Sequence, residues 1–161
     1  MEEIKSILIS KFEEIERRMQ SVLEQLNDDE VNWRPNESSN SIANLIVHIS
    51  GNINERVLNG ILKRNTVRNR DEEFEELHRT QPELLDITRD SFTIMIESIK
   101  DMSTEDWHKM QVVRNKERTH LEVLIQCAAH FSEHLGQLFY IAKMIKNTEY
   151  VTTSIPKKIK P

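Results

Sequence analysis

Residues 119–146 read THLEVLIQCAAHFSEHLGQLFYIAKMIK. Thr119 and Glu122 have the spacing of a capping box, in which two side chains accept hydrogen bonds from free backbone N–H groups at the start of a helix. Apolar residues then recur at helical spacing. The pattern predicts one long helix that begins near Thr119 and ends at about Ile145 or Lys146.

Three further helices are predicted N-terminal to this one. The 3.6-residue period of apolar side chains runs through residues 3–27 and again through residues 41–62. A third helix is expected over residues 80–100, because Thr80 and Glu83 form another capping box with proline in the first turn. The fold class is therefore all-α, a four-helix bundle.

Two long connections separate these helices. Residues 63–79 are almost entirely polar, which predicts a crossover on the surface, and the region from residue 103 to the fourth helix is expected to contain a helical turn and a short extended piece at residues 111–114. Residues 33–35, Trp-Arg-Pro, must be extended or turned, because proline disfavours helix in the residue before it. Residues 147–161 are expected to form a tail.

Composition limits the classes of protein to consider. The chain has 161 residues with three glycines and four prolines, too few for a protein built of β-hairpins, and its length suits a single domain over residues 1–161. The net charge of −5 argues against nucleic-acid binding, and the basic run at residues 157–160 is expected to be a frayed end. No stretch predicts a membrane span or a signal peptide, and one cysteine allows no internal disulfide, so we expect a cytoplasmic protein.

His130 and His134 are the first candidates for chemistry. A spacing of four residues places both imidazoles on one helix face, where they could bind one metal ion or be two hydrogen-bonded histidines. Gln126, Cys127 and Gln137 lie within about 60° of the pair on the helical wheel, so polar groups interrupt the apolar stripe together. This clustering favours the metal.

His48 interrupts the apolar stripe of the second helix in a similar way. Asn44 and Asn52 lie four residues to either side, so three polar side chains form a column among isoleucines and leucines. The alternatives are a metal ligand with supporting partners and a hydrogen-bonded core histidine. The remaining histidines are expected to be exposed: His78, His108 and His120.

Two motifs carry a resemblance to a known family. Residues 44–48, NLIVH, followed by residues 130–137, HFSEHLGQ, resemble the DinB/YfiT-like superfamily of metalloenzymes over nearly the whole chain. Residues 33–35 (WRP), 48–52 (HISGN) and 68–74 (RNRDEEF) look like an uncharacterised bacterial branch of that superfamily, a domain of unknown function. The resemblance implies the four-helix fold, a homodimer, and a metal site formed by His48, His130 and His134.

The resemblance also implies a range of functions. Some members of the superfamily transfer low-molecular-weight thiols and others are thiol-dependent isomerases, so we expect a metal-dependent thiol S-transferase or a related detoxification enzyme, with a hydrolase as another option. The alternative is a non-catalytic bundle that the metal stabilises. An all-histidine site suits zinc or nickel, and also accepts manganese or iron.

Several neighbouring residues have open roles. Residues expected to support the metal ligands or to line a substrate pocket are Asn44, Asn52, Gln126, Gln137 and Arg70. Arg70 belongs to the 68–74 motif, which could cover the metal, bind an anionic substrate or form an ion-paired loop. Cys127 is either a nucleophile or, as we favour, a buried structural residue. Arg56 follows Asn52 by one helical turn and could face the site, although a surface salt bridge is favoured, and Glu133 is left out of the catalytic set.

Overall fold

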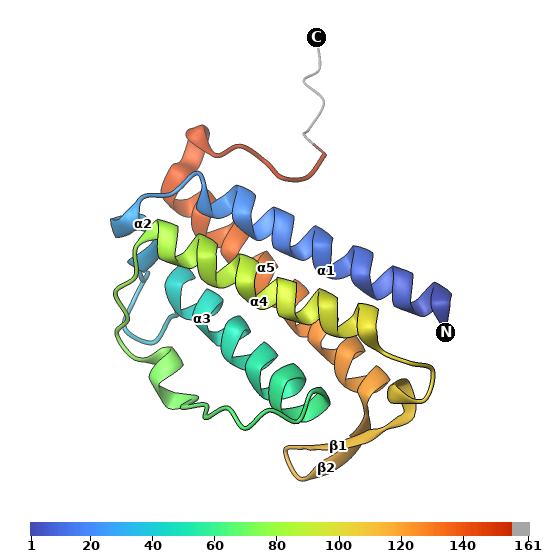
Figure 1. Ribbon diagram of the computed structural model, residues 1–161. Helices are drawn as coiled ribbons and strands as arrows, with labels where there is room; N and C mark the ends of the chain where they lie inside the picture. The colour runs from blue at the N-terminus through green and yellow to red at the C-terminus, as the bar shows by residue number, and fades with distance from the viewer. Residues whose placement is uncertain (156–161) are drawn as a thin grey trace.

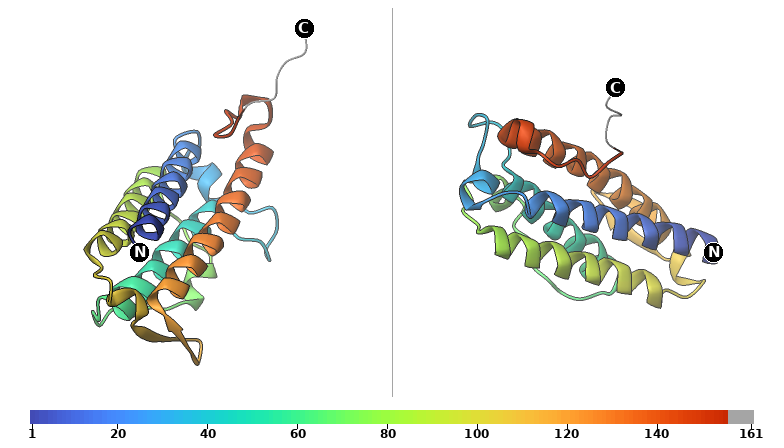
Figure 2. Two further views of the ribbon diagram at one scale, coloured as in Figure 1. Left: turned by 90° about the vertical axis from the view of Figure 1, so that its right-hand side faces the viewer. Right: turned by 90° about the horizontal axis from the view of Figure 1, so that it is seen from above.

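The computed structural model describes residues 1–155 and confirms the all-α four-helix bundle (Figure 1). Its long helices are α1 (Glu2–Leu23), α3 (Ile42–Ile53), α4 (Gln81–Asp101) and α5 (His120–Lys146). Helix α3 continues without a break into a π-helical segment, η1 (Asn54–Ile61). Helices α1 and α3 both pack against α4 and α5, so the four helices enclose one core (Figure 2).

Three phenylalanines lie where α1, α4 and α5 meet. Phe12, Phe92 and Phe131 are fully buried, and their ring centroids are 6.4, 6.2 and 6.0 Å apart in the three pairs. Burying one such side chain contributes about 1.5–3 kcal/mol to the free energy of folding. Phe131 directly follows His130 in the sequence, so this aromatic cluster fixes the part of α5 that carries two of the candidate ligands.

The helix starts follow the predicted caps. The side chains of Thr80 and Thr119 accept hydrogen bonds from the N–H groups of Glu83 and Glu122, and each glutamate completes the capping box. The predicted end of the first helix at residue 27 was wrong. Asn27 instead caps a short second helix, α2 (Asp28–Asn32), and α1 ends at Leu23.

The first connection, residues 63–79, is not entirely on the surface. It contains one 3₁₀ turn, η2 (Asp71–Phe74), which packs against α3 and buries the carboxylate of Glu73. Two hydrogen bonds from Asn44 hold this turn. The Asn44 Nδ2 donates to the carbonyls of Glu73 and Glu75, both at 2.9 Å.

The second connection contains a 3₁₀ turn, η3 (Asp106–His108), and an antiparallel hairpin of β1 (Met110–Val113) and β2 (Lys116–Thr119). Strand β1 confirms the extended piece expected at residues 111–114. Arg114 and Asn115 make the tight turn with φ values of 48° and 63°, as a two-residue hairpin turn with positive φ at both positions requires.

The end of the chain agrees with the expected tail only in part. A single 3₁₀ turn, η4 (Asn147–Glu149), follows α5, and the basic run at residues 157–160 lies outside the described residues. Among residues 1–155, no helix combines the length and the apolar character needed to cross a membrane.

Candidate metal centre

Three histidines from two helices meet in one place. His48 projects from α3, and His130 and His134 project from α5 one turn apart. One ring nitrogen from each lies within 4.8 Å of the others, and the His130 Nε2 is 3.4 Å from the His48 Nε2 and 2.8 Å from the His134 Nε2. His48 is buried, whereas His130 and His134 are half-buried, so the cluster faces outward from the core.

The buried carboxylate of Glu73 determines the tautomer of His48. The Glu73 Oε2 lies 2.9 Å from the His48 Nδ1. An ionised carboxylate only accepts hydrogen bonds, so Nδ1 carries the proton and donates it, and the Nε2 lone pair faces the other two histidines. Burial lowers the pKa of His48, which keeps this ring neutral near pH 7.

Glu73 is itself held on two sides. Arg68 donates from Nε to the Glu73 Oε1 at 2.6 Å and from Nη2 to Oε2 at 2.8 Å, and also pairs with Glu55. On the other side, a methyl group added at Gly51 would lie 2.0 Å from the Glu73 Oε1, so only glycine permits this approach to α3. The Phe74 ring then lies over His48, with centroids 4.9 Å apart.

Gln137 orients His134 in the same way. Its Oε1 lies 2.7 Å from the His134 Nδ1, and an amide oxygen accepts, so the proton sits on Nδ1 and the Nε2 lone pair faces His130. Burial, followed by the neighbouring His134 and His48, lowers the pKa of His130 to about 4. The His48 and His130 rings can therefore present neutral nitrogens at pH 7.

Two of the three nitrogen pairs have separations that suit ligands of one metal ion, and the third pair lies within 4.8 Å. Two nitrogen ligands at about 2.05 Å from a cation lie about 3.3 Å apart in tetrahedral coordination and about 2.9 Å apart in octahedral coordination. The observed separations of 3.4 and 2.8 Å match these values. A separation of 2.8 Å between the Nε2 atoms of His130 and His134 requires either a proton or a cation between them, and neutral imidazole nitrogens are common metal ligands.

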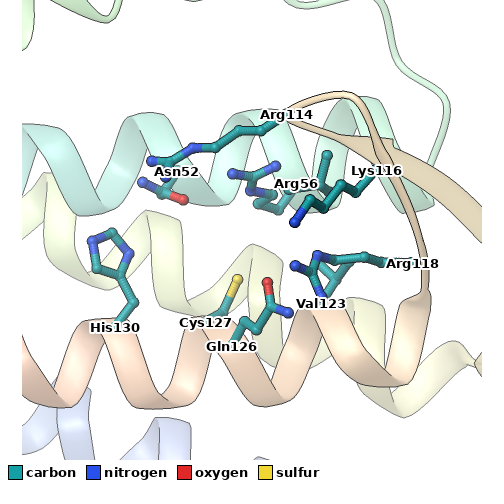
Figure 3. A pocket seen from close by; sticks show the side chains of 10 residues that line it. Asn52, Arg56, Arg114, Lys116, Arg118, Val123, Gln126, Cys127 and His130 are labelled. Carbon is teal, nitrogen blue, oxygen red and sulfur yellow. The ribbon is translucent and has the colours of Figure 1, made fainter.

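The other predicted supporting residues lie at different places. The Asn52 Nδ2 is 3.4 Å from the His48 Nε2, beside the three histidines. Asn44 is buried but contacts the crossover that carries Glu73 rather than His48. Gln126 is exposed and lines a cavity next to His130 (Figure 3). Arg70 is exposed and stacks over the Phe74 ring at 4.8 Å, so it reaches the site only through that ring.

Sequence reasoning missed Glu73 and Arg68, which supply the carboxylate and the cation beside His48. Both belong to the 68–74 motif, which was the available signal, whereas Arg70 was the residue of this motif predicted to support the site. Nothing in a polar loop marks which of its charged side chains will be buried, because the burial depends on contact with a distant helix.

Four further expectations concern single side chains. Cys127 is buried, and burial raises the pKa of its thiol to about 12, which suits a structural residue rather than a nucleophile. Arg56 pairs only at 3.9 Å with Glu55 and lines the cavity of Figure 3 instead of lying on the outer surface. The prediction that His120 is exposed was wrong: it is 2% exposed, because the hairpin and η3 cover the start of α5. Glu133 is exposed.

Comparison with solved structures shows the same fold in several bacterial proteins. A conserved protein from Enterococcus faecalis superposes with a TM-score of 0.74 at 13% identity, covering 88% of this chain and 96% of that one. DinB-like proteins from Bacillus subtilis (YjoA) and Bacillus cereus both superpose with a TM-score of 0.69. The first is 16% identical over 90% of this chain and 95% of its own, and the second is 13% identical over 86% and 90%. At these identities, the likeness shows the fold alone.

Comparison with curated proteins found no match. The model of one protein family, described as a protein of unknown function (DUF1572), matches residues 2–159. Because the match spans nearly the whole sequence, the chain belongs to the family described as a protein of unknown function (DUF1572), and it shares its fold with the DinB-like proteins.

Proposed function

We propose that His48, His130 and His134 bind one divalent transition metal ion and that the protein is a metal-dependent enzyme. The observation that carries this proposal is the convergence of three Nε2 atoms, two of which have their tautomer fixed by Glu73 and Gln137. A carboxylate or amide on the far nitrogen of a histidine is the usual support of a metal ligand in proteins. Zinc and nickel suit this donor set best, and manganese and iron are alternatives.

The open surroundings of the histidines favour catalysis over a structural role. Structural zinc sites have four protein ligands and no open position, whereas catalytic sites have three and leave room for water or substrate. Within the described residues, the cluster contains three ligands, and a cavity of about 430 Å³ opens beside His130. A substrate entering this cavity would reach the centre directly.

Thiol S-transfer is the reaction we propose for this site. In such a transfer, the thiol sulfur forms a bond to an electrophilic carbon, the leaving group departs with its bonding electrons, and the thiol proton is released. A bound divalent cation would favour the thiolate, which is the nucleophilic form of a thiol. The chain does not supply this sulfur, because Cys127 is buried with a thiol pKa of about 12. A low-molecular-weight thiol therefore enters as a co-substrate.

Metal analysis tests the first half of the proposal. We expect about one transition metal ion per chain in the purified protein and almost none in a His130→Ala/His134→Ala variant. The matched control is His78→Ala/His108→Ala, which removes two exposed histidines that do not belong to the cluster. Equal metal content in all three proteins would refute the metal site.

Thiol consumption tests the second half. The metal-loaded protein, the chelator-treated protein and the double variant are compared with a panel of electrophiles and small thiols. We expect turnover with the loaded protein alone. If the metal binds and its removal lowers the melting temperature, but no thiol is consumed, the non-catalytic metal-stabilised bundle is the better interpretation.

A further inference from the structure

The cavity beside His130 is strongly positive. It lies between α5, the junction of α3 with η1, and the β1–β2 hairpin, and has a volume of about 430 Å³. Four cationic side chains line it and no carboxylate does: Arg56, Arg114, Lys116 and Arg118. Figure 3 shows Arg56, Lys116 and Arg118 extending their charged ends into the space above Gln126 and Cys127, with His130 at one end. This concentration of charge contrasts with the net charge of −5 for the chain.

These charges are not neutralised by the protein. Among residues 1–155, no Asp or Glu lies within 4.0 Å of the charged groups of Arg114, Lys116 or Arg118, and Arg56 has one carboxylate at 3.9 Å. The Nε of Arg118 is also buried without a hydrogen-bond partner in the described part of the chain. A buried donor without an acceptor is costly, so a ligand oxygen that accepts from this group would be stabilised in the cavity.

The fold holds these cations together despite their mutual repulsion. Lys116 and Arg118 are two residues apart on β2, so both project from the same face of the hairpin. Gln111 anchors the hairpin to η1: it is buried, its Nε2 donates to the Arg56 carbonyl at 3.3 Å, and it occupies the space above Gly60 where a Cβ would stand. Arg56 and Arg118 are half-buried, whereas Arg114 and Lys116 are exposed, and cations that come from separate segments around one space raise its attraction for an anion.

We propose that this cavity binds a group with two or more negative charges, carboxylate or phosphate, on the small-molecule substrate that reacts at the histidine cluster. Arginine and lysine donors arranged around one space are the usual recognition of such groups. Binding there would leave the rest of the molecule next to His130. That the ligand is the substrate rests on the proposed metal-dependent function, whereas binding of the anion to the cavity does not need the metal.

Calorimetric titration of the metal-free protein tests the cavity separately from the metal centre. The probes are inorganic phosphate and citrate, each titrated at fixed ionic strength after the chelator has been removed. We expect saturable binding of one or both, with the stronger probe showing whether the site prefers phosphate or carboxylate. Lys116→Gln/Arg118→Gln should weaken this binding at least tenfold, while the control Arg17→Gln/Arg64→Gln, which removes the same charge from exposed positions, should change it less than twofold.

A second variant guards against misfolding of the hairpin. Gln126→Glu places a carboxylate of nearly the same shape in the cavity, so it should raise the melting temperature at low salt and abolish phosphate and citrate binding. The inference is overturned if the wild-type protein binds neither probe, or if the hairpin variant binds as well as the control. If the wild-type protein binds the anion probes but binds no metal ion, the proposed function is refuted and anion binding in the cavity is not.

Discussion

Replacing Glu73 by glutamine should damage the metal centre without removing any ligand. The carboxylate accepts from three donors at once: Arg68 Nε, Arg68 Nη2 and His48 Nδ1. A glutamine amide offers one accepting oxygen and one donating NH₂ group. If its NH₂ faces Arg68, two donors meet at the position of a 2.6 Å hydrogen bond. If its NH₂ faces His48, Nδ1 must become the acceptor, the proton moves to Nε2, and the metal-facing lone pair is lost.

Glu73→Gln should lower both the folding free energy and the metal affinity, and the size of each loss follows from the burial of these groups. Breaking a fully buried ion pair by removing one partner costs about 3–5 kcal/mol of folding free energy. The Glu73 side chain is 6% exposed and that of Arg68 11%, and Arg68 keeps its contact with Glu55, so we expect a loss near the lower end, about 3 kcal/mol. Loss of a supporting carboxylate weakens metal binding by about 10- to 100-fold.

Two measurements separate these effects. Urea unfolding of the metal-free protein gives the stability change, and competition with a chromophoric chelator gives the metal affinity. The control is Glu72→Gln, the exposed neighbour of Glu73, which should change neither. If Glu73→Gln lowers stability but leaves metal affinity within twofold of the wild type, the carboxylate only fastens the crossover, and our account of the His48 tautomer is refuted.

The other predictions concern residues around the same centre. Gly51→Ala should weaken metal binding by displacing Glu73, whereas Gly136→Ala, where an added Cβ has nothing within 4 Å, should leave it unchanged; chelator competition with both variants checks this. Because the pKa of His130 is lowered to about 4 in the fold, the unfolded chain binds more protons between about pH 6.5 and pH 4. Urea unfolding of the metal-free protein should therefore show stability falling as the pH drops through this window, with a smaller fall in His130→Gln. Cys127 should react with a thiol reagent only after denaturation, and rapid labelling of the native protein would contradict its burial.

The helices were predictable because their signals are local. Thr80 and Thr119 each carry a glutamate three residues later, and a capping box needs no distant partner. The same pattern at Asn27 and Glu30 explains why α1 ends early, and the sequence contains it, but the two aspartates between them were interpreted only as the end of the helix. No comparable local sequence pattern predicts the π-helical form of η1.

The sequence alone could group site residues only where they lie on the same helix. His130 and His134 lie on α5 at a spacing that any helix would bring together, whereas His48 was joined to them through a resemblance. Glu73 is about 25 residues from His48 in the chain, and its burial depends on Gly51, Arg68 and the fold of the crossover. His120 was predicted wrongly for a similar reason, because the hairpin that buries it is a tertiary contact.

The two long connections act on opposite sides of the histidine cluster. The crossover supplies Glu73 to His48, whereas the hairpin supplies Lys116 and Arg118 to the cavity beside His130. Among the described residues, Lys116 and Arg118 share no hydrogen bond or ion pair with Glu73 or Arg68, and the link between the two regions runs through Glu55, which pairs with both Arg68 and Arg56. Substitutions without shared partners have nearly additive effects. Under the functions proposed above, changes at Lys116 or Arg118 would alter which substrate is accepted while the crossover continues to hold His48.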